Sequence, residues 1–172
     1  VSGEVIGKQL NGLPALSCDY QSGNYASTGF AVSQHHVVTN AHVVYCCKKV
    51  TVRSLGSCFT GDDATVVSTE QKSDLGLLRL DRPLKHYGTL RSDKELQLGE
   101  VISTYDGGPG MGTCPEHLIK QGTVIQLNWM PDDSRLMRHT SPGRKGSSGG
   151  PVLDIAANIV GVVQGGNLGD SL

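Results

Sequence analysis

The sequence of 172 residues has few aromatic side chains, only 5% of the total, and no long apolar run. No apolar stretch approaches the roughly 18 residues of a membrane-spanning helix, so the sequence contains no candidate transmembrane helix. Positive charge is not clustered: 15 Lys and Arg residues are balanced by 16 Asp and Glu residues. A surface that follows nucleic-acid phosphates needs grouped cations, which argues against nucleic acid as a partner.

The chain also lacks an initiator methionine, and Val1 is not followed by a basic segment and then an apolar one. We expect either that an export signal has been removed or that the chain is a piece of a longer protein. The length fits one ordinary domain or two small, tightly joined halves.

Glycine, in contrast, is abundant, with 23 residues spread along the chain. Many glycines between short apolar runs predict tight turns between short strands, and therefore an all-β sandwich or barrel fold. The only helical element expected is one turn at Ala41 to Tyr45. The strands are expected at 28–32, 37–39, 50–52, 64–67, 75–80, 101–104, 122–127, 135–138, 151–154 and 159–163.

A polar stretch from Asp81 to Gly99, with Pro83 near its start, separates two strand-rich halves of similar length. We expect an N-terminal half over 1–83, a connector over 84–98 and a C-terminal half over 99–172. Together the three make one domain.

The segment Gly146-Ser147-Ser148-Gly149-Gly150-Pro151 places serines among glycines. Acyl transfer needs an exposed hydroxyl and backbone N–H donors directed at the developing oxyanion, and glycines allow the tight backbone that supplies both. The alternative is an ordinary Gly/Ser loop. The G-x-S-x-G pattern also occurs in the nucleophile elbow of α/β-hydrolases, in which the histidine follows the serine. Residues 149–172 contain no histidine, which excludes the elbow.

A general base must therefore come from upstream of Ser148, and His42 has the most suitable setting of the six histidines. It stands where an apolar strand turns into a short helical stretch, which can hold an imidazole rigidly with one face open. The other histidines lie in turns or polar segments and are expected to be solvated; they are His35, His36, His86, His117 and His139.

Asp74 opens the apolar run Leu75-Gly76-Leu77-Leu78. A carboxylate there is costly to bury unless it is hydrogen-bonded. A hydrogen bond from an imidazole N–H would meet that need and would leave the other ring nitrogen free to take a proton. The alternative is an ordinary aspartate at a strand edge.

Three segments follow one another in the order His, Asp, Ser: Thr39-Asn40-Ala41-His42-Val43-Val44, Ser73-Asp74-Leu75-Gly76-Leu77-Leu78 and Gly146-Ser147-Ser148-Gly149-Gly150-Pro151. Together they resemble the trypsin-like serine proteases, and among these the bacterial HtrA/Deg-related branch. The resemblance spans nearly the whole chain. It implies two six-stranded antiparallel β-barrels of the chymotrypsin type, with the active site in the cleft between them.

The resemblance also assigns roles to residues of the site. Ser148 is the nucleophile, His42 the general base and Asp74 the residue that orients His42, while the N–H groups of Gly146 and Ser148 form the oxyanion hole. The implied activity is a serine endopeptidase that works through an acyl-enzyme intermediate, without cofactor or metal, on protein or peptide substrates. Two alternatives are a catalytically silent binding module of the protease fold and a viral-type polyprotein processing protease.

The chain departs from the family in two places. Digestive members carry an aspartate immediately before the nucleophile, which pairs with a newly cut amino terminus, whereas this chain has Ser147. We therefore expect that activation does not depend on a new terminus. The chain ends at Leu172, so the PDZ module of many HtrA-like proteases, their large assemblies and their chaperone behaviour are not carried over.

Family alignment places the primary specificity pocket near 141–144 and 163–166, with Pro142 at its base and Val163, Gln164 and Gly166 along its wall. Neither segment contains an acidic residue, which argues against a preference for Lys or Arg. Pro142 and Val163 instead predict a small or medium apolar side chain in the pocket.

Five cysteines, an odd number, leave at least one thiol free or paired between chains. One or two disulfides in an exported protein and five reduced thiols in a cytosolic one both fit the count. Cys114-Pro115-Glu116-His117 has a spacing that could bind zinc with Cys46, Cys47 or Cys58, but we expect Cys47 in a disulfide or as a buried thiol. With the family resemblance, we expect a secreted or periplasmic protein rather than a cytoplasmic one.

Overall fold

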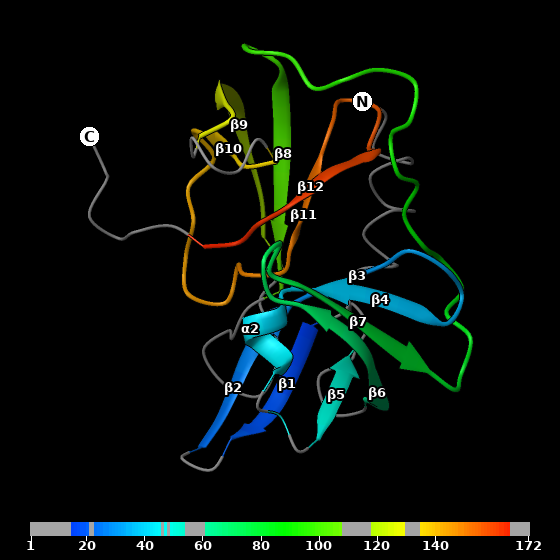
Figure 1. Ribbon diagram of the computed structural model, residues 1–172. Helices are drawn as coiled ribbons and strands as arrows, with labels where there is room; N and C mark the ends of the chain where they lie inside the picture. Colours follow the sequence, from blue (N-terminus) through cyan, green and yellow to red (C-terminus); the bar gives the residue numbers. More distant parts are fainter. Residues whose placement is uncertain are drawn as a thin grey trace.

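The computed structural model describes residues 15–20, 23–45, 47, 49–53, 61–107, 118–129 and 135–165. These residues form two curved antiparallel sheets, one above the other in Figure 1, with a single short helix, α2 (Ala41–Val44), beside the first sheet. The predicted all-β fold is therefore confirmed. Within the described part of the chain, no helix is long and apolar enough to span a membrane.

The first sheet has the strand order β2-β1-β5-β6-β7-β4-β3. Its core consists of apolar side chains that alternate along the strands: in β5, Val50 and Val52 are buried, while Thr51 between them is only half-buried. Val44 of α2 joins this core and anchors the helix to the sheet. The strands are β1 (Ala15–Tyr20), β2 (Gly23–Thr28), β3 (Phe30–Ala31), β4 (His36–Thr39), β5 (Val50–Arg53), β6 (Asp62–Glu70) and β7 (Leu75–Leu80).

The second sheet has the order β10-β9-β8-β11-β12 and its own apolar core around Ile102, Val124 and Val152. A further cluster joins the two sheets, because Phe30 of β3 packs with Tyr105 of β8 and neighbouring side chains of the second sheet. The strands are β8 (Val101–Asp106), β9 (Leu118–Leu127), β10 (Met137–His139), β11 (Pro151–Leu153) and β12 (Ile159–Val162).

The expected count of six strands in each half is wrong for the part of the chain that the structure describes, where the sheets have seven and five strands. The sequence analysis missed β1 and β2, whose residues show no apolar run. They pair with each other as a hairpin, and β1 joins the sheet by pairing with β5, with Leu16 opposite Val52. Pairing with a neighbouring strand is not visible in local sequence.

The polar segment between β7 and β8 is attached to the second sheet. Leu90 forms an isolated parallel bridge with Ile159, and the Arg91 N–H donates to the Ile159 carbonyl at 3.0 Å. The division into 1–83, 84–98 and 99–172 stays a prediction.

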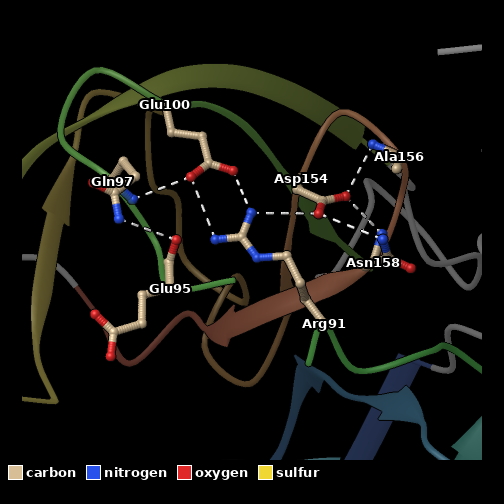
Figure 2. A network of polar contacts seen from close by, with 7 residues as sticks. All are labelled: Arg91, Glu95, Gln97, Glu100, Asp154, Ala156 and Asn158. Atoms are coloured by element: carbon tan, nitrogen blue, oxygen red, sulfur yellow. Dashed lines mark hydrogen bonds and ion pairs between the residues drawn. The ribbon is translucent and has the colours of Figure 1, made fainter. Parts of the chain in front are cut away.

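Arg91 is the centre of a buried ionic network that fixes this segment (Figure 2). Its side chain is only 3% exposed and forms hydrogen bonds with Glu100 and, at 3.4 Å, with Asp154. Asp154 is buried as well, and its carboxylate accepts the N–H groups of Ala156 and Asn158, which shapes the turn between β11 and β12. The network therefore joins the connecting segment, the start of β8 and this turn.

Replacing Arg91 with methionine should lower the free energy of unfolding by about 3–5 kcal/mol at neutral pH, because the buried carboxylate of Asp154 and the mostly buried one of Glu100 lose their cation. Urea unfolding of the variant and the wild type measures the loss. A matched control is Arg79→Met, which breaks a surface pair whose side chains are 55% and 97% exposed. This control should cost at most about 1 kcal/mol. Equal losses for the two variants would contradict the assigned role of the network.

The effect of Arg91→Met should also depend on pH. Hydrogen bonding from Arg91 lowers the pKa of Glu100, although burial acts in the opposite direction. A lowered carboxyl pKa contributes stability above the ordinary carboxyl range near pH 4, and that contribution is lost as pH falls through the folded-state pKa. The difference between the wild type and Arg91→Met should therefore shrink on acidification below about pH 4.

Candidate active site

His42 is the exposed residue of α2. Ala41, Val43 and Val44 are buried, so the helix packs on three of its four residues and leaves His42 on the outer side. The His42 side chain is 52% exposed. The short helix therefore fixes the backbone of His42 while its imidazole stays accessible.

Asp74 lies in the turn before β7 and binds His42 through both carboxylate oxygens. Oδ1 accepts the His42 backbone N–H at 2.9 Å, and Oδ2 is 2.7 Å from Nδ1 of the ring. A carboxylate can only accept, so Nδ1 carries the proton and Nε2 has a free lone pair. The Asp74 side chain is 13% exposed, which limits competition from water.

The backbone of Asp74 is held in the left-handed region, with φ 52°. Its carbonyl accepts the N–H of Ala41 at 3.1 Å and the side-chain amide of Asn40 at 3.0 Å. Aspartate tolerates this conformation better than most residues. The sequence analysis quoted Asn40 in a motif but gave it no role, because its contact depends on the turn before β7.

Ser148 follows a tight turn formed by residues 144–147. The N–H of Ser147 donates to the Arg144 carbonyl at 3.0 Å, and Gly146, the third residue of the turn, has φ 93°. Lys145, the second residue, is not among the residues with positive φ. A negative φ followed by a positive one defines a type II turn, which favours glycine at the third position. We call these four residues the oxyanion turn, after the role that is proposed for them below.

The first sheet holds the carbonyl groups around Ser148. Thr28 Oγ1 donates to the Gly146 carbonyl at 2.7 Å, and the Ser148 carbonyl accepts both the Thr28 N–H at 3.1 Å and Ser27 Oγ at 2.6 Å. The flanking N–H groups of Ser147, Gly149 and Gly150 all donate to backbone carbonyls. Among the described residues, the N–H groups of Gly146 and Ser148 donate to no protein acceptor.

Gly149 brings the serine segment against the histidine segment. A Cβ at this position would lie 2.2 Å from the Thr28 carbonyl oxygen and from Thr39 Oγ1, and 3.2 Å from the backbone nitrogen of Asn40. The segment that carries Ser148 therefore packs directly against the segment that leads to His42. No direct hydrogen bond joins His42 and Ser148 in the described part of the chain.

Replacing Gly149 with alanine should therefore destabilise the protein. The φ of 83° is unfavourable for alanine and the added methyl group overlaps backbone, which together predict a loss of about 2–5 kcal/mol. Gly143→Ala is the matched control, because a Cβ at Gly143 has nothing within 4 Å. Urea unfolding should separate the two variants clearly, and a neutral Gly149→Ala would contradict the close approach.

The residues expected in the specificity pocket lie in two segments: Pro142 precedes the oxyanion turn, and Val163 is hydrogen-bonded to the residues that follow Ser148. Val163 exchanges two backbone hydrogen bonds with Gly149 and Gly150, each 2.8 Å long, and exposed Gln164 follows it. Pro142 is exposed, and its carbonyl accepts Lys120 Nζ at 3.0 Å. Gly166 lies outside the described residues.

Four of the histidines expected to be solvated are partly buried: His35, His36, His86 and His139. His35 and His36 use Nδ1 in hydrogen bonds to the Leu80 carbonyl and the Ser33 hydroxyl. Burial lowers the pKa of His139 in β10, although a backbone hydrogen bond with Ser141 acts against this. The expectation was wrong for these four. For His35, His36 and His139, the turn and the sheet, and not the local polarity, decide the exposure.

Cys47 forms a disulfide, as one of the two expectations for it predicted. Its partner belongs to the part of the chain whose side chains are not described, which also contains Cys114 and His117 of the possible zinc set. A cysteine in a disulfide has no thiolate to offer a metal. No group of three or more potential metal ligands occurs among the described residues.

Comparison with known proteins gives the family. Residues 27–162 match the family of trypsin-like peptidase domains. The serine protease Rv3671c of Mycobacterium tuberculosis is 29% identical over 152 residues, which cover 84% of this chain and 37% of that protein. A probable periplasmic serine endoprotease of the DegP-like type from Brucella suis is 25% identical over 138 residues, or 78% of this chain and 26% of that protein.

The fold matches as well. A crystal structure of the serine endoprotease from Yersinia pestis superposes with a TM-score of 0.80 at 15% identity, over 95% of this chain and 57% of that chain. The chain spans between 21% and 37% of the length of the curated relatives it matches. The match over residues 27–162 and the named relatives confirm the resemblance to trypsin-like proteases and their HtrA/Deg-related branch. The chain therefore belongs to the family of trypsin-like peptidase domains.

Proposed function

We propose that the site hydrolyses peptide bonds with Ser148 as the nucleophile, His42 as the general base and Asp74 as the residue that orients His42. The observation that carries the proposal is the two-point contact of the Asp74 carboxylate with the backbone N–H and Nδ1 of His42. It fixes the ring in one orientation and leaves Nε2 as the basic nitrogen.

The reaction follows from these positions. Ser148 Oγ attacks the peptide carbonyl carbon while its proton passes to His42 Nε2, and a tetrahedral intermediate forms. Collapse of the intermediate breaks the C–N bond, and His42 returns the proton to the leaving amine. Water then attacks the acyl-enzyme with His42 again as base, which releases the carboxylic acid and restores the Ser148 hydroxyl.

The N–H groups of Gly146 and Ser148 are the proposed donors to the oxyanion. Two features support them: neither donates to a described protein acceptor, and the neighbouring carbonyls are held by Ser27 and Thr28. Fixed donors stabilise the negative charge without having to reorient during the reaction, and loss of one typically costs about 3 kcal/mol of transition-state stabilisation.

Labelling with a fluorophosphonate tests the proposal, because only an activated serine reacts quickly with it. We expect rapid labelling of the native protein, loss of labelling after heat denaturation, and a modified peptide in which mass spectrometry locates the adduct on Ser148. Labelling that is equally slow in the native and the denatured protein would favour the catalytically silent binding module instead.

The substrate class follows from the same segments. Protein or peptide substrates whose scissile carbonyl follows a small or medium apolar side chain are the proposed class, since Pro142 and Val163 border the site and the nearby described segments 141–144 and 163–165 contain no acid. Fluorogenic peptides that differ only at this residue test the preference. Faster cleavage after Arg or Lys than after Ala or Val would contradict it. A viral-type processing protease would differ mainly in requiring an extended recognition sequence.

We also propose that the protein acts outside the cytoplasm. DegP-like relatives are named as periplasmic, and the disulfide at Cys47 fits an oxidising compartment.

A further inference from the structure

A second aspartate, Asp106, is buried behind the oxyanion turn. It is the last residue of β8 and its side chain is 3% exposed. A buried carboxylate needs several partners to offset the loss of water. Asp106 has three such partners. Two of them lie in the turn before Ser148, and the third lies in β9, the strand that pairs with β8.

Two of these partners are the ends of the oxyanion turn. Arg144 donates Nε to Asp106 Oδ1 at 2.6 Å, and its Nη2 lies 2.5 Å from the same oxygen. Ser147 Oγ donates to Oδ2 at 3.1 Å and in turn accepts the Arg144 backbone N–H at 3.0 Å. One carboxylate therefore holds the first and last residues of the turn together.

The third partner fixes the chain that leads into the turn. Lys120 of β9 places Nζ 2.7 Å from Asp106 Oδ2 and 3.0 Å from the Pro142 carbonyl. On the other side, the Gly107 N–H that follows Asp106 donates to Thr28 Oγ1, the same hydroxyl that holds the Gly146 carbonyl. Residues of β8, β9 and the first sheet therefore all form hydrogen bonds or ion pairs with the turn or with the chain that leads into it.

The Gly146 N–H belongs to the central peptide of this turn. A type I turn and a type II turn share the hydrogen bond between first and fourth residues, but differ by a rotation of the central peptide of the turn. In this chain the central peptide joins Lys145 and Gly146, so its rotation would turn the Gly146 N–H away from its present direction. Contacts to both ends keep the turn closed, and the hydrogen bond from Thr28 Oγ1 to the Gly146 carbonyl holds the residue that carries this N–H.

From these contacts we infer that Asp106 is a positioning residue that keeps the oxyanion turn in its working conformation before substrate binds. The inference rests on the proposed function. Digestive members of the family carry an aspartate at the position of Ser147, and that aspartate orders the turn. In this chain Ser147 has only a hydroxyl, and Asp106 of β8 supplies the carboxylate. The turn is then ordered from within the domain, and formation of the site needs no ion pair with a new amino terminus.

The test measures the rate of fluorophosphonate labelling and, with a fluorogenic peptide, kcat and KM of Asp106→Asn. This variant keeps the shape but removes the charge that holds Arg144 and Lys120. We expect kcat and the labelling rate to fall about tenfold to a hundredfold, short of the 10²–10³-fold loss seen when an oxyanion donor is removed, with little change in KM. Hydrogen exchange of a peptide that covers residues 143–148 should become faster.

Asp62→Asn is the matched control, because it breaks an ion pair with Arg82 in the first sheet, 2.6 Å long and away from the turn. It should leave both rates within twofold of the wild type. Ser147→Ala removes both hydrogen bonds of the Ser147 hydroxyl, to Asp106 and from the Arg144 N–H, and leaves the cations paired. It should lower kcat about threefold to tenfold, and it decides the matter if Asp106→Asn does not fold. Unchanged kcat in a folded Asp106→Asn or, failing that, in Ser147→Ala would overturn the inference while the proposed function stands. Absence of labelling in the wild type would overturn both.

Discussion

Replacing Ser148 with alanine is expected to lower kcat by about 10⁶-fold, the size of loss that removal of a nucleophilic serine causes in other triad proteases. Alanine has no hydroxyl, so no acyl-enzyme forms, and His42 is left without a proton to accept. Binding of substrate and the unfolding free energy should change little, because among the described residues the Ser148 carbonyl, and not its hydroxyl, forms hydrogen bonds. Cleavage of casein by the purified variant and the wild type measures the loss.

The control is Ser92→Ala, an exposed serine of the connecting segment, which should keep wild-type activity. Urea unfolding of both variants excludes misfolding as the cause of inactivity. Casein cleavage by Ser148→Ala at a rate near that of the wild type would refute Ser148 as the nucleophile.

Asp74→Asn should lower turnover about 10⁴-fold, as the equivalent change does in trypsin-like proteases. An asparagine amide can donate to the imidazole, which favours the tautomer with its proton on Nε2, and that nitrogen is then unable to act as a base. The variant should fold normally, because asparagine tolerates the φ of 52° that position 74 requires. The expected loss is therefore catalytic and not structural.

Single-turnover acylation of the Asp74→Asn variant by an activated ester measures this loss at the chemical step. Asp81→Asn, whose side chain in the wild type is 97% exposed, is the matched control and should retain full activity. A fall of less than tenfold for Asp74→Asn would show that His42 is oriented by other contacts.

The parts of the fold that local sequence determines were predictable. β7 appears over Leu75–Leu80 as its apolar run predicts, and α2 follows β4 at the expected helical turn. β1 was missed because it becomes a strand through pairing with β5, and β2 because it pairs with β1. Strand number likewise depends on pairing across the sheet, which local patterns do not report.

The site shows the same division. His42, Asp74 and Ser148 stand in motifs of the right order, and the structure gives His42 and Asp74 the expected contact, while their catalytic roles stay predictions. Asp106 carried the signal used for Asp74, an acid at the end of an apolar strand. It was not singled out, because its partners at Lys120, Arg144 and Ser147 come together only in the folded chain.

Thr28 connects the two sheets at the place where the proposed chemistry occurs. It belongs to β2 of the first sheet, yet its hydroxyl holds Gly146 and Gly107, and its N–H holds Ser148, all from the second half of the chain. A molecule in which only one sheet has formed therefore has no ordered serine loop. Under the proposed function, proteolytic capacity requires both sheets, so we expect that a newly made or partly unfolded chain does not digest its own kind while many of its peptide bonds are exposed.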